Sequence, residues 1–300
     1  NWKKNIYKKI YKKVYKHLAM SIYKDNIYVS DNIGFIYAIS LKTGNVLWIK
    51  NHGIPFKSKI KTFNDKIFLI NQDNRIIAFS AQNGSVIWSI RTISSFIKSQ
   101  DLLSLAISKK GFLIASNSSG DLLKINSENG KINWSLNTLP TSLKSETDFF
   151  KSSNVVLSDQ NILFSTKKSF FSYNLENGYS NWKIDVSAID TPIISGNNIF
   201  FITENGFFVI LDKNTGTILS SYYIFKVLKE KKRYTKITGY IMGSGKIYAL
   251  TRNGYLIVCS ASSGKVEKFI KISDPLNNSP IIYDGKLFIY TKNSKLIGYN

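Results

Sequence analysis

Positions 37–48 read YAISLKTGNVLW, a short β-rich run, a tight turn and a second run that ends in tryptophan. Glycine followed four residues later by tryptophan recurs along the chain. In two degenerate repeats another residue replaces the tryptophan. The pairs are Gly44/Trp48, Gly84/Trp88, Gly130/Trp134, Gly178/Trp182, Gly216/Ser220 and Gly264/Lys268. A repeat of roughly 40 residues with about four short strands is typical of a β-propeller blade. The sequence therefore predicts an all-β fold made of four-stranded blades.

Two turn signals divide each repeat into strands. The glycine of each pair supplies the positive φ of a tight hairpin. An earlier turn carries another glycine, such as Gly34 or Gly206, and Asn74 takes this place in the second repeat. The runs between the turns, such as 67–70 and 199–202, are short and rich in β-branched and aromatic residues. They are therefore expected to be strands rather than helices.

The two ends of the chain predict how the array of blades closes. The final repeat, residues 284–299, lacks a Gly/Trp strand, whereas the chain opens with Asn1-Trp2-Lys3, which reads like the Trp134 strand. We expect residues 1–5 to complete the last blade and so to remove exposed sheet edges. Residues 1–300 would then form a single propeller domain of seven blades. Its fourth-strand positions are Trp2, Trp48, Trp88, Trp134, Trp182, Ser220 and Lys268.

The repeated tryptophan has a structural interpretation. A tryptophan wedged between neighbouring blades buries a large apolar area. The functional alternative is a platform on which a cofactor or sugar stacks. Because the feature recurs from blade to blade, the packing interpretation is favoured.

The composition indicates a folded, strongly basic protein. Of 300 residues, 43% are hydrophobic, and the longest apolar run, about 255–261, is far shorter than a membrane span. The net charge is +22, and 37 of the 41 basic residues are lysines because only four are arginines. Base readout and bidentate phosphate contacts favour arginine. We therefore interpret the charge as diffuse and solvated, with an acidic protein or lipid surface as the alternative and nucleic acid the least favoured partner.

The sequence offers little catalytic chemistry. The single cysteine, Cys259, lies in an apolar run and is interpreted as a buried hydrophobic residue. The two histidines, His17 and His52, cannot build repeated metal sites. No phosphate loop, HExxH, GxSxG or calcium-loop pattern occurs. We expect no catalytic residue, metal or cofactor, although propeller enzymes can assemble sites from distant blades.

Three segments interrupt the repeat. Residues 6–18 form a basic connection with at most a helical turn, or alternatively an amphipathic helix for an anionic membrane. Residues 226–236 form a basic loop, either solvated or a docking site for an acidic partner or headgroup. Residues 135–153 place hydrophobic residues beside a cation, a composition typical of protein contacts.

The segment 37–48 resembles the quinoprotein (PQQ-like) repeat, roughly YALD-x-x-TG-x-x-x-W, and the resemblance covers nearly the whole chain. It implies a β-propeller, but it is weak evidence for function. Quinoprotein dehydrogenases use a quinone, calcium and commonly an adjacent cysteine pair. The single cysteine and the missing calcium pattern argue against that activity here.

The order of segments is similar to the BamB family of outer-membrane protein assembly factors. This resemblance implies a cofactor-free monomeric scaffold on the periplasmic side of the outer membrane, lipid-anchored through a segment outside this sequence. Its implied partners are a BamA-like barrel subunit and unfolded outer-membrane protein clients. The family's contact loop matches positions Leu139, Leu143, Lys144 and Glu146.

The match to this family departs in two ways. Lys144 replaces an arginine, which weakens a bidentate contact, and seven blades are predicted instead of eight. Two alternatives stay open: a degenerate or active quinone-dependent oxidoreductase, and a basic propeller that binds anionic lipid or another polyanion.

Overall fold

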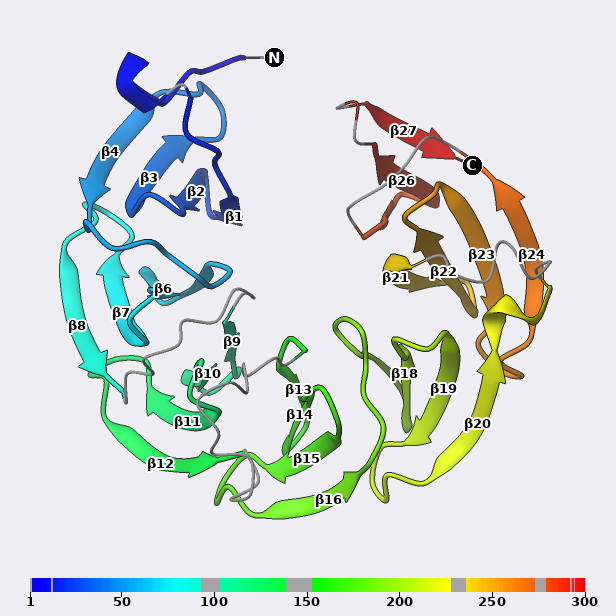
Figure 1. Ribbon diagram of the computed structural model, residues 1–300. Coiled ribbons are helices and arrows are strands. Elements are labelled where there is room, and N and C mark those ends of the chain that lie inside the picture. Colours follow the sequence, from blue (N-terminus) through cyan, green and yellow to red (C-terminus); the bar gives the residue numbers. More distant parts are fainter. Residues whose placement is uncertain are drawn as a thin grey trace. The chain divides into compact units, whose positions relative to one another are not determined.

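The computed structural model describes residues 2–11, 13–92, 103–138, 153–227, 236–272, 279–291, 293 and 295–299. Almost all of its regular structure is β-strand, and within each sheet the strands are neighbours in chain order (Figure 1). The chain forms two compact units, residues 1–160 with 175–178 and residues 161–174 with 179–300. None of the described helices has the length and apolar character that crossing a membrane requires.

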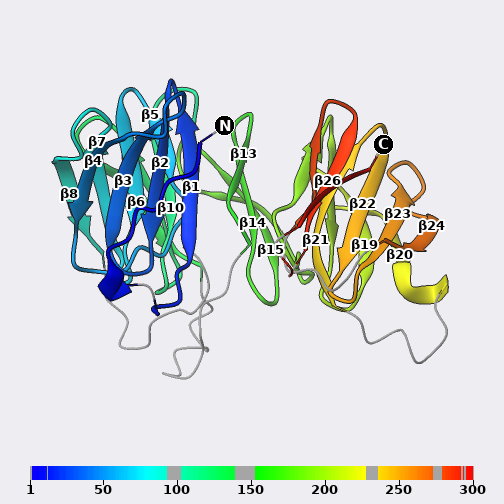
Figure 2. The same ribbon diagram turned by 90° about the horizontal axis from the view of Figure 1, so that it is seen from above.

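The first three sheets belong to the first unit. They consist of β1 (Leu18–Tyr23), β2 (Asn26–Asp31), β3 (Phe35–Ser40) and β4 (Val46–Asn51); β5 (Lys61–Phe63), β6 (Lys66–Ile70), β7 (Arg75–Ser80) and β8 (Val86–Arg91); and β9 (Ser104–Ile107), β10 (Phe112–Ser116), β11 (Asp121–Asn126) and β12 (Ile132–Asn137). Figure 2 shows the strands of these sheets standing side by side.

Four further sheets follow along the chain. They consist of β13 (Val156–Ser158), β14 (Asn161–Ser165), β15 (Phe170–Asn174) and β16 (Ser180–Ile184); β17 (Ile193–Ser195), β18 (Asn198–Ile202), β19 (Phe207–Asp212) and β20 (Ile218–Tyr223); β21 (Ile237–Gly243), β22 (Lys246–Thr251), β23 (Tyr255–Ser260) and β24 (Val266–Lys271); and β25 (Ile281–Tyr283), β26 (Lys286–Tyr290) and β27 (Leu296–Tyr299). The described helices are two short 3-10 turns, η1 (Lys9–Tyr11) and η3 (Ile224–Val227).

The predicted all-β fold, a seven-bladed propeller, is confirmed. Six of the sheets have four strands, and the last has three within the described residues. Completion of that last blade by residues 1–5 stays a prediction. The described part of segment 6–18 contains the η1 turn and the first residue of β1, as the first interpretation expected, and no longer helix.

The hydrophobic core lies between successive sheets. Ile67 and Leu69 of β6 pack towards the first sheet, whereas Phe68 and Ile70 of the same strand pack towards the third. All four side chains are fully buried. Because both faces of an inner strand such as β6 are covered, it reads as a continuous hydrophobic run, whereas an outer strand such as β12 keeps an alternating pattern.

Candidate functional site

Each of the five tryptophans lies against the glycine of the next Gly/Trp turn. A Cβ atom placed on Gly84 would lie 2.7 Å from the Trp48 ring, and one on Gly216 would lie 2.7 Å from the Trp182 ring. Trp2, Trp88 and Trp134 meet Gly44, Gly130 and Gly178 in the same way. Gly264, the partner of a degenerate repeat, meets the Ser220 hydroxyl instead.

The indole N–H groups of the tryptophans also form hydrogen bonds within the protein. Each donates a hydrogen bond to a backbone carbonyl in the turn that it covers. These bonds run from Trp2 to Leu41 (3.0 Å), Trp48 to Ala81 (3.1 Å), Trp88 to Ser127 (2.9 Å), Trp134 to Glu176 (3.1 Å) and Trp182 to Lys213 (3.0 Å). With one face and the N–H engaged, the geometry favours the packing interpretation over a stacking platform for ligands.

A row of capping side chains, which sequence reasoning missed, ends the second strand of the blades. Asp31 accepts hydrogen bonds from the backbone N–H groups of the following turn, including that of Phe35 at 2.8 Å. Thr203 accepts one from Phe207 at 3.0 Å. The residues that cap in this way are Asp31, Asn71, Asn117, Thr166, Thr203, Thr251 and Thr291. The available signal was Asp, Asn or Thr three positions before the Gly, Asn or Ser of the earlier turn.

In the first blade, the surface next to the cap is filled by the chain's own N-terminal segment. Tyr7 donates a hydrogen bond to the second carboxylate oxygen of Asp31 at 2.7 Å, and its ring meets Tyr37 edge-on at 5.9 Å. Tyr11 meets Phe35 in the same manner at 5.5 Å. Burial and the Asp31 carboxylate raise the pKa of Tyr7 well above its ordinary value, and burial with the same carboxylate raises the pKa of Tyr37 to about 12.

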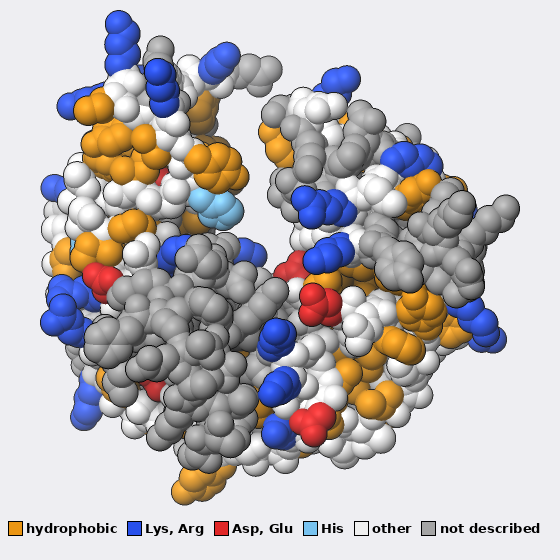
Figure 3. All heavy atoms as spheres, in the orientation of Figure 1, with side chains coloured by type: hydrophobic (Ala, Val, Ile, Leu, Met, Phe, Trp, Pro, Cys, Tyr) orange, Lys and Arg blue, Asp and Glu red, His pale blue; other side chains and the backbone are white. Residues whose placement is uncertain are grey.

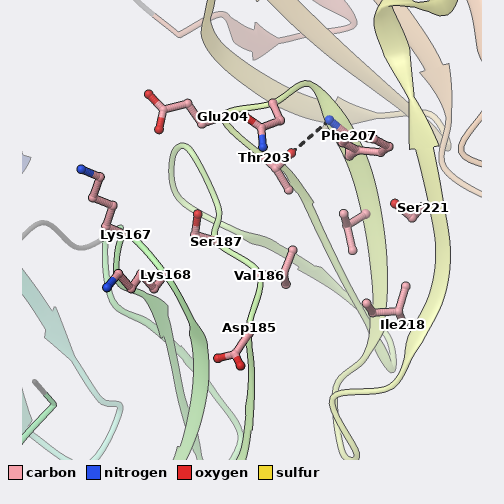
Figure 4. A pocket seen from close by; sticks show the side chains of 12 residues that line it. Lys167, Lys168, Asp185, Val186, Ser187, Thr203, Glu204, Phe207, Ile218 and Ser221 are labelled. Atoms are coloured by element: carbon pink, nitrogen blue, oxygen red, sulfur yellow. Dashed lines mark hydrogen bonds between the residues drawn. The ribbon is translucent and has the colours of Figure 1, made fainter. Parts of the chain in front are cut away.

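In the fifth blade, the corresponding surface is open and forms a cavity of about 440 Å³. Its apolar wall comes from Phe207 and Val209 of β19, Ile218 of β20 and Val186 of the connection after β16. The capping residue Thr203 lies at its edge (Figure 4). All lining residues belong to the second unit.

Charged side chains surround this cavity. Figure 4 shows Lys167 and Lys168, from the β14–β15 turn, on the side opposite Phe207. Asp185 is already engaged, since it accepts a hydrogen bond from Ser169 at 2.9 Å and lies 3.8 Å from Lys183. Within the described part of the chain, the two lysines and Glu204 form no hydrogen bond or ion pair, so their charges are available to a ligand.

Metal-ligating side chains do not gather among the described residues. Among them, no three His, Cys, Asp or Glu side chains converge as metal ligands. Cys259 is fully buried in β23, where burial raises the pKa of its thiol to about 12, and it has no second cysteine to pair with. His52 is stacked on Phe56 at 5.4 Å.

The residues predicted to contact a partner, Leu139, Leu143, Lys144 and Glu146, lie outside the described residues, as does most of the basic segment 226–236. On the face that Figure 3 draws, the charge of the described residues does not gather in one patch. Figure 3 shows lysine and arginine side chains scattered over the visible face, with acidic side chains among them.

Comparison with known proteins places this fold in a family. The family model of the outer membrane protein assembly factor BamB matches residues 2–222, which is 221 of the 300 residues. The chain belongs to the BamB family. The crystal structure of BamB from Moraxella catarrhalis is similar over 94% of this chain and 83% of that protein, with a TM-score of 0.79 and 12% sequence identity. At that identity the likeness shows the fold alone.

Quinoprotein enzymes share the repeat with this BamB family member. A quinoprotein ethanol dehydrogenase from Pseudomonas putida is 32% identical over 72 residues, which are 21% of this chain and only 12% of the enzyme. The quinohemoprotein alcohol dehydrogenase ADHIIG from Pseudomonas putida HK5 is similar over 90% of this chain and 61% of its own, with a TM-score of 0.69 and 10% identity. The resemblance to the BamB family and to the PQQ-like repeat is thus confirmed.

Proposed function

We propose that this protein is a non-enzymatic scaffold on the periplasmic side of the outer membrane that assists the assembly of β-barrel proteins. The observation that carries the proposal is the BamB family match across residues 2–222, which starts at the first tryptophan. The buried thiol of Cys259 and the lack of converging metal ligands among the described residues support a role without catalysis. A lipid anchor outside this sequence would hold the scaffold at the membrane.

The proposed partner is a BamA-like barrel subunit, held through the loop that carries Leu143 and Lys144. An aliphatic side chain beside a cation suits a protein contact with an apolar centre and an acidic rim. Client strands would add to the outer strands of the blades, whose backbone edges can pair with an extended chain. Outer strands such as β4 and β20 also expose apolar side chains, Leu47 and Leu219 among them.

The contact is tested by capture of purified BamA on the immobilised protein. The double variant Leu143→Asp with Lys144→Glu reverses the character of the loop, and we expect it to lose at least about tenfold in capture, as removal of an interface anchor does. The control is Leu47→Asp with Lys50→Glu, which makes the same changes on the exposed β4 strand and should leave capture intact. Equal capture by the loop variant and the wild type would remove the proposed site.

A second candidate is a quinone-dependent oxidoreductase, which the partial identity to the ethanol dehydrogenase favours. Titration with pyrroloquinoline quinone and calcium, read by absorbance and melting temperature, separates the two functions. The scaffold proposal expects no saturable change in either signal. A saturable shift in both would instead support the oxidoreductase.

A further inference from the structure

The cavity of the fifth blade and the filled surface of the first blade occupy the same place in their repeats. In the strand registers, Phe35 and Tyr37 of β3 correspond to Phe207 and Val209 of β19. Likewise Val46 of β4 corresponds to Ile218 of β20. Asp31 and Thr203 each cap the residue four positions later. The first and fifth blades therefore have equivalent surfaces at this position. In the first blade, Tyr7 and Tyr11 cover that surface.

From this repeat we infer that the open groove on the fifth blade, lined by Thr203, Phe207, Val209 and Ile218, binds an extended segment of another protein that inserts an aromatic side chain next to an acidic residue. The inference adds a second site to the proposed scaffold and does not depend on the BamA contact. The first blade provides the chemistry of the occupant, because its own occupant is a tyrosine.

The apolar wall of the groove suits an aromatic ring. Phe207 is 41% exposed and Ile218 is 51% exposed, whereas Val209 behind them is buried. An incoming ring would meet Phe207 edge-on or offset, the arrangements that aromatic pairs prefer. A cavity of about 440 Å³ falls in the range of roughly 300–1,000 Å³ that ligand pockets have. It therefore accommodates a ring together with part of the peptide that carries it.

The cap provides a polar partner for a phenol. In the first blade, the Asp31 carboxylate accepts the hydroxyl hydrogen of Tyr7. Thr203 uses its oxygen to accept the N–H of Phe207, and its own hydroxyl hydrogen can be donated to an incoming oxygen. Tyrosine is therefore expected to bind better than phenylalanine, while both satisfy the apolar wall.

The charges on the rim select the neighbours of the aromatic residue. Lys167 and Lys168 line the groove, whereas Asp185, also in the lining, is engaged with Ser169 and Lys183. Glu204 is the one further acid in the lining. The two lysines and two acids of the lining cancel formally, but Asp185 is paired with Lys183 outside the lining, which leaves two lysines against the single carboxylate of Glu204. This balance favours an acidic residue beside the aromatic one.

The chain after β16 contributes Val186 to the wall of the groove but does not fill it. Eight residues, 185–192, connect β16 to β17, and Ile189 bonds to the carbonyl of Ile202 along the way. By contrast, the connection after β20 forms η3, whose Ile224 and Phe225 are buried in the core that contains Val266 of the sixth blade. The connection that precedes the fifth blade also packs Val186, Ala188 and Ile189 against this core, but it leaves the cavity beside Phe207 and Ile218 unfilled.

The test measures fluorescence anisotropy of a labelled peptide, GSDYDSG, titrated with the protein. We expect saturable binding that weakens at least about tenfold for GSDADSG, because the aromatic anchor is lost, and also for GSKYKSG. Two variants should weaken binding to a similar degree: Ser221→Trp, which fills the groove from exposed Ser221, and Lys167→Glu with Lys168→Glu, which reverses its rim.

Matched controls separate the groove from general effects. Ser89 of β8 occupies the position of Ser221 in the second blade, so Ser89→Trp should bind the peptide like the wild type. Lys109→Glu with Lys110→Glu makes the same charge change in another exposed turn and should also have little effect. Unchanged circular dichroism and melting temperature of Ser221→Trp would confirm that the groove variant folds.

The inference is overturned if the wild type does not bind GSDYDSG, if the alanine peptide binds equally well, or if Ser221→Trp binds like Ser89→Trp. Failure of the inference is distinguishable from failure of the scaffold proposal. Ser221→Trp should still capture BamA, and Leu143→Asp with Lys144→Glu should still bind the peptide. A segment of the chain itself that occupies the groove would appear as absent peptide binding in the wild type.

Discussion

Lys124 is a buried lysine in a chain whose lysines are expected to be solvated. The abundant lysines predict solvated charge, yet the Lys124 side chain is only 2% exposed within β11. Its ammonium lies 3.0 Å from the Glu176 carboxylate and 4.3 Å from the centre of the Phe112 ring. A buried cation requires such partners, because an isolated charge is costly to remove from water. For Lys124 the surface interpretation is wrong.

His52 is a second residue whose environment decides its chemistry. Its ring is stacked on Phe56 and meets Phe79 edge-on at 6.1 Å, and its Nε2 lies 3.2 Å from the amide nitrogen of Asn71. If the Asn71 amide donates to Nε2, that nitrogen must be unprotonated. Burial, and then the Arg75 charge, lower the pKa of His52 below its ordinary value of 6.5.

The lowered pKa predicts a loss of stability in mild acid. As the pH falls below about 6.5, the unfolded chain takes up a proton at His52 before the folded protein does, so the free energy of unfolding decreases until the folded pKa is passed. Above that window the contribution is fully present. The variant His52→Phe keeps an aromatic ring without the titration. We expect its urea midpoint to fall less than that of the wild type between pH 7.5 and 5.5, and parallel pH profiles would contradict the assignment.

At the scale of the element, the Gly/Trp hairpin is the unit that the chain repeats. In six blades the register between the third and fourth strands shifts at one position, for example between Ala78 and Phe79. The bulge and the positive φ of the turn glycine belong to one hairpin type, in which a left-handed residue follows a tight turn. The absence of a side chain there also lets the preceding tryptophan approach the backbone.

Substitution of this glycine tests the close approach. Gly84 has a φ of 71°, and a Cβ atom there would lie 2.7 Å from the Trp48 ring. Gly53 has a φ of 75°, but nothing lies within 4 Å of its Cβ position. Both alanine variants should lose about 1 kcal/mol from backbone strain.

Gly84→Ala should lose a further ~1–3 kcal/mol, the usual cost of overpacking. Chemical denaturation of Gly84→Ala, Gly53→Ala and the wild type measures the difference. Equal losses in the two variants would mean that the tryptophan contact contributes nothing beyond the backbone conformation.

At the scale of the whole molecule, the net charge of +22 predicts weak attraction to any polyanion. The five ion pairs seen among the described residues leave most of the lysines solvated. We expect binding to vesicles with anionic lipid at low salt, and its loss near 0.15 M salt, where the Debye length is only ~8 Å. Sedimentation with anionic and with neutral vesicles measures this, and retention at high salt would instead indicate a specific lipid site.

The closure of the propeller also belongs to this scale and stays a prediction. Within the first unit, Trp2 covers Gly44 and bonds to Leu41 as the other tryptophans do in their turns. Leu18, Met20 and Ile22 of β1 nevertheless remain 42%, 68% and 63% exposed. An apolar row of this kind on the first blade is what the last blade of a closed propeller would cover.

The sequence by itself determined the blades. The Gly/Trp turns and the short β-rich runs between them are local signals that span only a few residues. Each repeat therefore specifies its own hairpins, and the blades can be counted along the chain. The tryptophan positions were readable for the same reason, whereas the caps at Asp31 and Thr203 were overlooked although their spacing is equally local.

Only the tertiary structure decided which surfaces stay open. The groove on the fifth blade joins Lys167, Val186 and Phe207, which come from three separate segments of the chain. Whether such a surface is filled, as Tyr7 fills its counterpart on the first blade, depends on where the neighbouring connection runs after each outer strand. That path follows from packing between elements and not from the local sequence pattern. A cavity remains where no neighbouring segment places a side chain, and the local pattern does not specify where neighbouring segments run.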